Sequence, residues 1–163
     1  MAKRSKSGLK HKRHAEKRRQ QNQAVASRLK TLAKQATTPE ALKEAIAALD
    51  KAAGSGIVHK NTAARRKSRL VARQFRILMR ASILRARKKP IGVIQEALGV
   101  PPFVARKIME QVDNFPPPAF PAIFARLEEA DRAIKSTGHP RLALETLIAS
   151  LCLPAPQAVG GRS

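Results

Sequence analysis

From Asn61 to Lys89 the chain has neither proline nor glycine, and its apolar residues keep a helical spacing. Leu70, Ile77 and Leu84 recur at heptad spacing, which places them on one face of an α-helix. Pro90 then stops the helix, which would be on the order of 40 Å long. Alternating β-branched runs, which are typical of strands, are absent from the rest of the chain. The sequence therefore predicts an all-α fold.

The other predicted helices are bounded by capping residues, prolines and glycines. A first helix is expected from about Ser7 to Ala36. The second has Thr38 as its N-cap, a proline at its first position and glycines at its end. Asn61 can cap the long third helix. After Pro90 the predicted helices span about 91–98, 102–113, 119–136 and 141–152, and the tail 153–163 is expected to be disordered.

The excess of positive over negative charge is confined to the first half of the chain. Residues 1–89 hold 26 Lys and Arg residues against 4 acidic residues, a net charge of +22, whereas residues 90–163 hold 7 of each. This asymmetry indicates two functional units. A charge excess of this size repels itself unless a polyanion neutralises it, so nucleic acid is the expected partner. The neutral residues 90–163 are expected to be dispensable for that binding.

An anionic membrane surface is the competing partner, and the sequence argues against it. A membrane-surface helix needs an apolar face beside its basic face, and Leu9 is the only sizeable apolar residue between Lys3 and Arg19. No apolar run is long enough to span a bilayer, and no hydrophobic stretch of a signal peptide follows the basic N-terminus. The single cysteine, Cys152, fits a reducing cytoplasm, and its apolar neighbours predict a buried thiol. We therefore expect a cytoplasmic protein with no membrane partner.

Catalytic and metal-binding patterns are not found. Gly54–Gly56 follows a helix, whereas a phosphate-binding P-loop follows a strand and ends in Gly-Lys-Ser/Thr. The acidic residues between Glu128 and Asp131 are expected to form a solvated face. His59 has no second His or Cys at ligand spacing, so a role in capping a turn or in contacting RNA is expected instead. No catalytic residue, metal or cofactor is predicted.

The basic half is suited to phosphates rather than to bases. The segment before Asn22 is almost wholly polar, so it is expected to become ordered only when phosphates bind. The chain has no Trp or Tyr, and its five Phe residues begin at Phe75, so the basic half cannot stack bases on aromatic rings. Such a surface reads backbone shape, and its charge alone does not separate RNA from DNA. Residues 94–112 have a helix-turn-helix outline, but the second helix begins Pro102-Phe103-Val104, which favours a packed helix pair.

Two motifs of the basic half resemble the family of bacterial ribosomal protein S20. They are "KS..K..R..EKRR..N", from Lys6 to Asn22, and "G(I)VHKN.AARRKSRL", from Gly56 to Leu70. The resemblance covers about residues 3–73, and Thr62 stands where the family commonly has a lysine. It implies a three-helix bundle, spanning residues 1–74, that binds small-subunit ribosomal RNA directly and neighbours other ribosome components. The matched residues implied as RNA contacts are Lys6, Lys10, Arg13, Lys17, Arg18, Arg19, His59, Lys60, Asn61, Arg65, Arg66 and Lys67. Asn22 and Arg69 complete the candidate set on the chemistry of their side chains.

The second half resembles a different family. "ARQFRIL", "ALGVPPFVARK" and "LEEADRAIKSTGHPRLALETLI" are similar to the C-terminal helical domain of the delta subunit of the bacterial DNA polymerase III clamp loader, over about residues 71–151. In that family this domain joins an oligomeric collar, which implies clamp-loader subunits as partners of residues 75–152. The clamp-binding and ATPase-like domains of that family are absent here, so clamp opening is not implied. The segment "RLVARQFR" fits both families, so one long helix can serve both.

The favoured function is therefore a structural protein of the small ribosomal subunit, located on the ribosome in the cytoplasm. The alternative is a protein–protein assembly module of the clamp loader, carried by residues 75–152.

Overall fold

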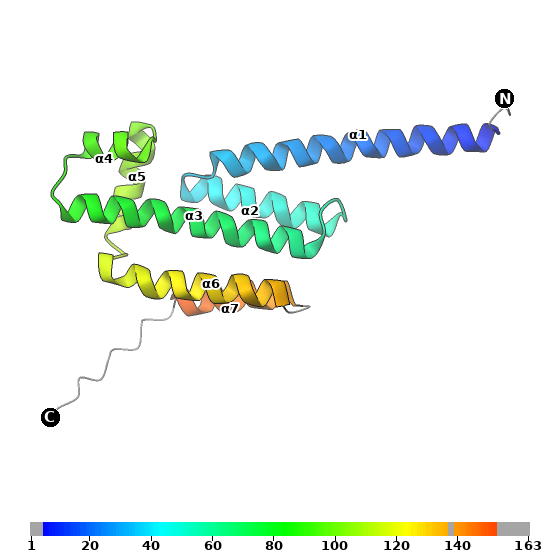
Figure 1. The fold of residues 1–163 in the computed structure, drawn as a ribbon. Coiled ribbons are helices and arrows are strands. Elements are labelled where there is room, and N and C mark those ends of the chain that lie inside the picture. Colours follow the sequence, from blue (N-terminus) through cyan, green and yellow to red (C-terminus); the bar gives the residue numbers. More distant parts are fainter. Residues whose placement is uncertain (1–4, 137–138, 153–163) are drawn as a thin grey trace. The chain divides into compact units, whose positions relative to one another are not determined.

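The structure of the chain is a computed structural model that describes residues 5–136 and 139–152 (Figure 1). Within these residues it contains seven α-helices, one short 3-10 helix and no strand, so the predicted all-α fold is confirmed. The helices form two compact units that divide between His59 and Lys60. The expected domain boundary at residues 74 and 75 stays a prediction, and the expected disordered tail lies outside the described residues.

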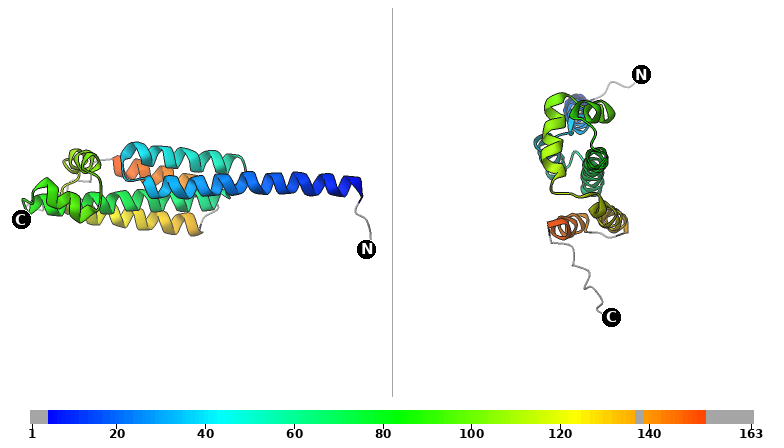
Figure 2. Two further views of the ribbon diagram at one scale, coloured as in Figure 1. Left: turned by 90° about the horizontal axis from the view of Figure 1, so that it is seen from above. Right: turned by 90° about the vertical axis from the view of Figure 1, so that its left-hand side faces the viewer.

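The first unit is a pair of helices, α1 (Lys6–Gln35) and α2 (Pro39–Gly54), joined by a short turn. Thr38 caps α2 as expected, because its Oγ1 accepts a hydrogen bond of 3.2 Å from the backbone N–H of Ala41. Only the second half of α1 packs against α2, where Leu29 and Leu49 are buried. The first half of α1 extends past the end of α2, as the views in Figures 1 and 2 show.

The start of α1 corrects an expectation from the sequence. The segment before Asn22 is helical from Lys6 onward. Because this segment has few apolar residues, it was expected to become ordered only when a partner binds. Helix formation needs local interactions as well as burial, and Ala, Lys, Arg, Glu and Gln all have high helix propensity. Ser5 adds an N-cap, because its Oγ accepts a hydrogen bond of 3.3 Å from the N–H of Gly8.

The second unit is built around the long helix α3 (Lys60–Ala86). The other elements are α4 (Ile91–Leu98), α5 (Pro102–Val112), the 3-10 helix η1 (Pro117–Ala119), α6 (Phe120–Ser136) and α7 (Pro140–Cys152). Helices α4, α5, α6 and α7 all pack against α3, and α6 and α7 also pack against each other. The prediction that the long third helix continues into a C-terminal helical domain is therefore confirmed.

Helix α3 begins and ends at slightly different places than expected. It starts at Lys60, so Asn61 lies inside the helix and is not its cap. It ends before the turn at Lys88, whose φ of 54° is left-handed. The backbone N–H of Lys89 then bonds to the carbonyl of Leu84 at 3.1 Å, the pattern of a Schellman motif. This motif, rather than Pro90, closes the helix.

The core of the second unit includes residues from both halves of α3. Its largest fully buried side chains are Phe120, Ile94, Ile108 and Ile134. Helix α3 contributes Ala64, Leu78 and Ala81 to the same cluster, so the helix is packed from its first turns to its last. Burying each large aliphatic or aromatic side chain stabilises the fold by about 1.5–3 kcal/mol. Any change that removes α4–α7 would therefore expose the apolar face of α3.

Three arginines of the second unit bind backbone carbonyls in the last turns of helices. Arg80 of α3 donates to the carbonyl of Ala97 in α4 at 2.7 Å, and Arg126 of α6 donates to the carbonyl of Ser150 in α7. Arg85 of α3 donates to the carbonyl of Met109 in α5 at 3.4 Å and pairs with Asp113. The last carbonyls of a helix lack partners within the helix and lie at its negative end. These arginines therefore stabilise helix ends.

The predicted burial of Cys152 is wrong, because the thiol is exposed at the end of α7. The buried face of α7 contains Leu144 and Leu147, whereas Ile148 is 60% exposed. Cys152 lies about 100° around the helix from the preceding residue, Leu151, which packs against the core. An apolar local sequence therefore does not bury every residue of α7.

Candidate nucleic-acid interface

Helix α1 presents an almost purely cationic surface. Its 30 residues contain ten Lys and Arg residues and one acidic residue, Glu16. The seven candidate contacts on this helix are all exposed; they are Lys6, Lys10, Arg13, Lys17, Arg18, Arg19 and Asn22. Because no part of the protein described by the structure covers these side chains, they are accessible to a polyanion.

Helical spacing brings four of these seven candidates onto one stripe of α1. Lys6, Lys10, Arg13 and Lys17 are separated by four, three and four residues, which places them on one face. The other three candidates, Arg18, Arg19 and Asn22, point to other sides of the helix. A flat partner would therefore meet the stripe, and only a partner that surrounds α1 would contact all seven.

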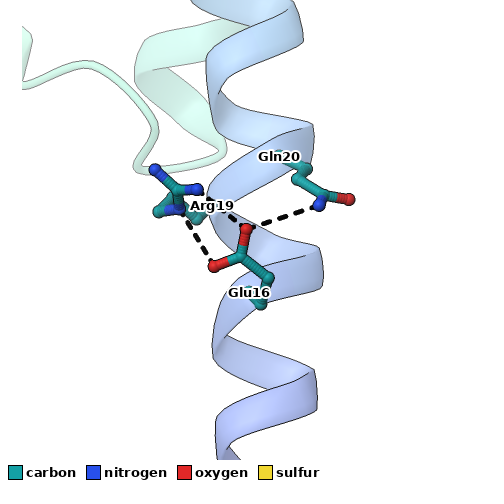
Figure 3. Close-up of polar contacts among 3 residues, drawn as sticks. All are labelled: Glu16, Arg19 and Gln20. Atoms are coloured by element: carbon teal, nitrogen blue, oxygen red, sulfur yellow. Dashed lines mark hydrogen bonds and ion pairs between the residues drawn. The ribbon is translucent and has the colours of Figure 1, made fainter.

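Arg19 is engaged by the one acidic residue of α1 (Figure 3). Its Nε and Nη2 donate to the two carboxylate oxygens of Glu16 at 3.0 and 2.8 Å, and Gln20 donates to the same carboxylate at 3.3 Å. The hydrogen bonds from Arg19 lower the pKa of the Glu16 carboxyl below its usual value, and they raise the pKa of the Arg19 guanidinium. Glu16 thus orients Arg19 and occupies one edge of its guanidinium.

The second candidate group lies at the start of α3. His59, Lys60, Arg65, Arg66 and Arg69 are exposed. The remaining two candidates, Asn61 and Lys67, are half-buried. These partly covered side chains have less surface to offer a ligand than the arginines beside them.

The arginines of α3 form a longer stripe than the candidate set covers. Arg66, Arg69, Arg73, Arg76 and Arg80 follow each other at spacings of three and four residues, and all five are exposed. The sequence from Lys60 to Lys89 contains no acidic residue. The spacing is visible in the sequence, but the candidate set ended at Arg69 because the motif that resembles ribosomal protein S20 ends at Leu70.

Apart from His59, which is the last residue of the first unit, the two candidate groups belong to different units. The seven candidates of α1 lie in the first unit, and those from Lys60 onward lie in the second. The candidates from Lys6 to Asn22 therefore form a surface of the first unit, and those from Lys60 to Arg69 form a surface of the second.

The exposed first half of α1 should exchange its amide hydrogens much faster than the second half. Most of the stability of a helix in a protein comes from tertiary packing, and residues 9–24 are all exposed, so nothing that the structure describes packs against this part of α1. Hydrogen exchange measured by mass spectrometry on the free protein should show peptides within residues 9–24 at least about tenfold less protected than those around Leu29. Equal protection along α1 would contradict this, and bound RNA should slow the exchange of the first half.

The described residues contain no group of three or more His, Cys, Asp or Glu side chains that could hold a metal ion. Among the helices that the structure describes, none is both long and apolar enough to cross a membrane.

The all-α fold and its two exposed cationic surfaces define a small basic helical protein whose charge suits nucleic acid. Comparison with known families then gives the particular family. The model for ribosomal protein S20 matches residues 3–74, and the model for the C-terminal domain of the DNA polymerase III delta subunit matches residues 55–151. The chain belongs to the ribosomal protein S20 family through its first part, and to the family of that delta-subunit domain through its second.

Curated relatives support the first assignment. Small ribosomal subunit protein bS20 of Carboxydothermus hydrogenoformans is 41% identical over 76 residues, which are 40% of this chain and 81% of the relative. The bS20 protein of Thioalkalivibrio sulfidiphilus is 42% identical over 77 residues, 41% of this chain and 90% of the relative. That of Roseiflexus is 46% identical over 79 residues, 44% of this chain and 87% of the relative. No solved structure gives a significant match.

The two family matches overlap on residues 55–74. This overlap contains the first half of α3, which carries candidate contacts such as Arg66 and also the buried Ala64 and Leu70. The prediction that one long helix serves both families is therefore confirmed by the matched ranges.

Proposed function

We propose that the protein is a structural component of the small ribosomal subunit that binds its ribosomal RNA directly. The observation that carries this proposal is the identity of 41–46% to bS20 proteins over 81–90% of their length. The cationic surfaces of α1 and α3 supply the chemistry, because Lys and Arg side chains neutralise phosphates. The protein would lie on the ribosome among other ribosome components, with no catalytic step of its own.

Within this function the two candidate groups act as phosphate contacts. On α1 the stripe of Lys6, Lys10, Arg13 and Lys17 meets one strand of the RNA, and Arg18, Arg19 and Asn22 reach other strands around the helix. On α3 the exposed residues contribute most, whereas the half-buried Asn61 and Lys67 contribute less. The contacts fix position on a folded RNA rather than read its sequence.

The test is selection for small-subunit ribosomal RNA over a DNA duplex of equal length at one fixed salt concentration. We expect the RNA to bind more tightly, because a folded RNA offers strands on several sides of α1. The affinity for RNA should also fall by roughly 10³–10⁵ between 50 and 200 mM salt if six to ten phosphates are contacted. Equal affinity for the two nucleic acids, or a flat salt dependence, would overturn the proposal.

A second candidate function is assembly with clamp-loader subunits, which the delta-subunit match over residues 55–151 favours. Helix α7 exposes Leu142 and Ile148, and a groove of about 410 Å³ lies between α6 and α7 beside Leu142. The measurement is co-elution of the full chain with clamp-loader subunits at micromolar concentration. A variant with Leu142→Asp and Ile148→Asp is the control. Absence of co-elution by the unmodified chain would exclude this function.

A further inference from the structure

We propose that the RNA-binding surface of α3 continues past Arg69, along Arg73 and Arg76 to Arg87 in the turn after the helix. This extension lies in the part of the chain that matches the delta-subunit domain alone, apart from Arg73. Its ligand is the phosphate backbone of the same RNA, so the inference rests on the proposed function.

The geometry of α3 aligns these residues with the candidate contacts. From Arg66 the stripe proceeds in steps of three or four residues through Arg69, Arg73, Arg76 and Arg80. Each step is about 5–6 Å along the helix surface. Arg87 is seven residues beyond Arg80, and its backbone N–H still bonds to the carbonyl of Ile83 at 3.1 Å, so it keeps nearly the same direction.

Two charges of this surface, those of Arg76 and Arg87, lack an acidic partner among the described residues. The side chains of Arg76 and Arg87 are exposed and make no hydrogen bond or ion pair with any residue that the structure describes. On α6, by contrast, Arg132 pairs with Glu128 at 3.9 Å and Lys135 pairs with Asp131. These two cations of α6 therefore have acidic partners along their own helix, whereas α3 has no acidic residue that could play this part.

Three features of α3 favour phosphates over other ligands. Its apolar face is buried in the core through Leu78 and Ala81, so it has no free apolar face to insert into a membrane. Arginine presents a planar fork of donors that binds phosphate oxygens in pairs. The aromatic ring of α3, Phe75, is half-buried and packs edge-on against Phe115, so it is not placed to stack bases. The surface therefore suits a sugar-phosphate backbone.

The test compares two pairs of charge-removing substitutions in the full chain. Variant one carries Arg76→Gln and Arg87→Gln, and the matched control carries Arg132→Gln and Lys135→Gln, so both lose two positive charges. Binding to small-subunit ribosomal RNA is titrated between 50 and 200 mM salt. We expect the salt slope of variant one to fall by roughly two units, near one for each lost phosphate contact, and that of the control to stay unchanged. Equal slopes for the two variants would overturn the inference.

Two further variants keep the outcomes distinct. Arg76→Lys with Arg87→Lys retains both charges and should keep most of the slope, which separates charge from altered folding. Arg65→Gln with Arg66→Gln and Arg69→Gln removes three contacts inside the S20-matched segment. If this triple variant lowers the slope and variant one does not, the extension is absent while the proposed function stands. If neither lowers it, α3 does not bind the RNA and the inference fails with it.

Discussion

The triple substitution Arg65→Gln, Arg66→Gln and Arg69→Gln should weaken RNA binding and lower its salt slope by up to about three units, near one for each lost phosphate contact. All three side chains are exposed, and on an α-helix they fall within one broad face of α3. The measurement is a salt titration of the full chain and the triple variant on small-subunit ribosomal RNA.

Replacing the three consecutive residues Arg65, Arg66 and Lys67 with glutamine should lower the salt slope less than the triple substitution that includes Arg69. Consecutive residues of an α-helix point about 100° apart, so these three do not share a face. Lys67 is also half-buried. If the consecutive triple lowered the slope more than the triple with Arg69, the RNA would have to surround α3, and the stripe would not describe the interface.

Replacing Phe120 with alanine should destabilise the second unit by about 3–5 kcal/mol. Its side chain is 1% exposed and lies at the start of α6, where its ring is 6.4 Å from that of Phe124. Since small domains are stable by only about 5–15 kcal/mol, the loss would be a large part of the total. Urea unfolding followed by circular dichroism measures the change in the free energy of unfolding.

Phe103→Ala is the matched control for this substitution. Its ring is 64% exposed on α5, so the same change in side chain should alter the free energy of unfolding by less than about 0.5 kcal/mol. A loss of stability in the Phe120 variant as small as that expected for the control would contradict the prediction. Because α3 lines the same core, the Phe120 variant should also bind RNA more weakly at temperatures where the second unit begins to unfold.

Most helix boundaries could be predicted because their signals are local. Thr38 with Pro39 marks the start of α2, and the prolines after α3 separate the short helices. The end of α3 was harder to place, because the left-handed backbone at Lys88 occurs in a residue other than glycine. The exposure of Cys152 was also missed, since burial depends on which face of α7 meets the core.

The candidate site could be predicted as a set of residues but not as surfaces. Charge and the resemblance to ribosomal protein S20 identify the residues, and most of these residues are exposed on the helices, as a binding role requires. The spacing of Glu16 and Arg19 on one helix is compatible with their pairing. The sequence could not show that Arg80 and Arg85 bind helix ends, because these hydrogen bonds join different helices.

The packing of α3 also changes one expected experiment. Judged by charge alone, residues 90–163 are dispensable for RNA binding. In the structure, however, α4–α7 cover the apolar face of α3, including Ala64 beside the candidate contacts. A truncation at Lys89 would therefore unfold part of the surface that it is meant to isolate, so substitutions in the full chain are the sounder test.

Helix α3 runs without a break from the segment that matches the S20 family into the segment that matches the delta-subunit domain alone. It therefore fixes the rotation of one segment relative to the other about the helix axis. Each residue added or removed between Leu70 and Gln74 would turn everything beyond it by about 100° around the helix axis. The arginines before the change and those after it would then face different directions, while Leu78 and Ala81 would rotate out of the core. A heptad insertion, by contrast, would restore the phase to within about 20°. Two sequences joined through an unbroken helix therefore depend on each other's rotation about the helix axis. Only certain lengths of the joining segment keep the arginines on one exposed face and the apolar residues in the core.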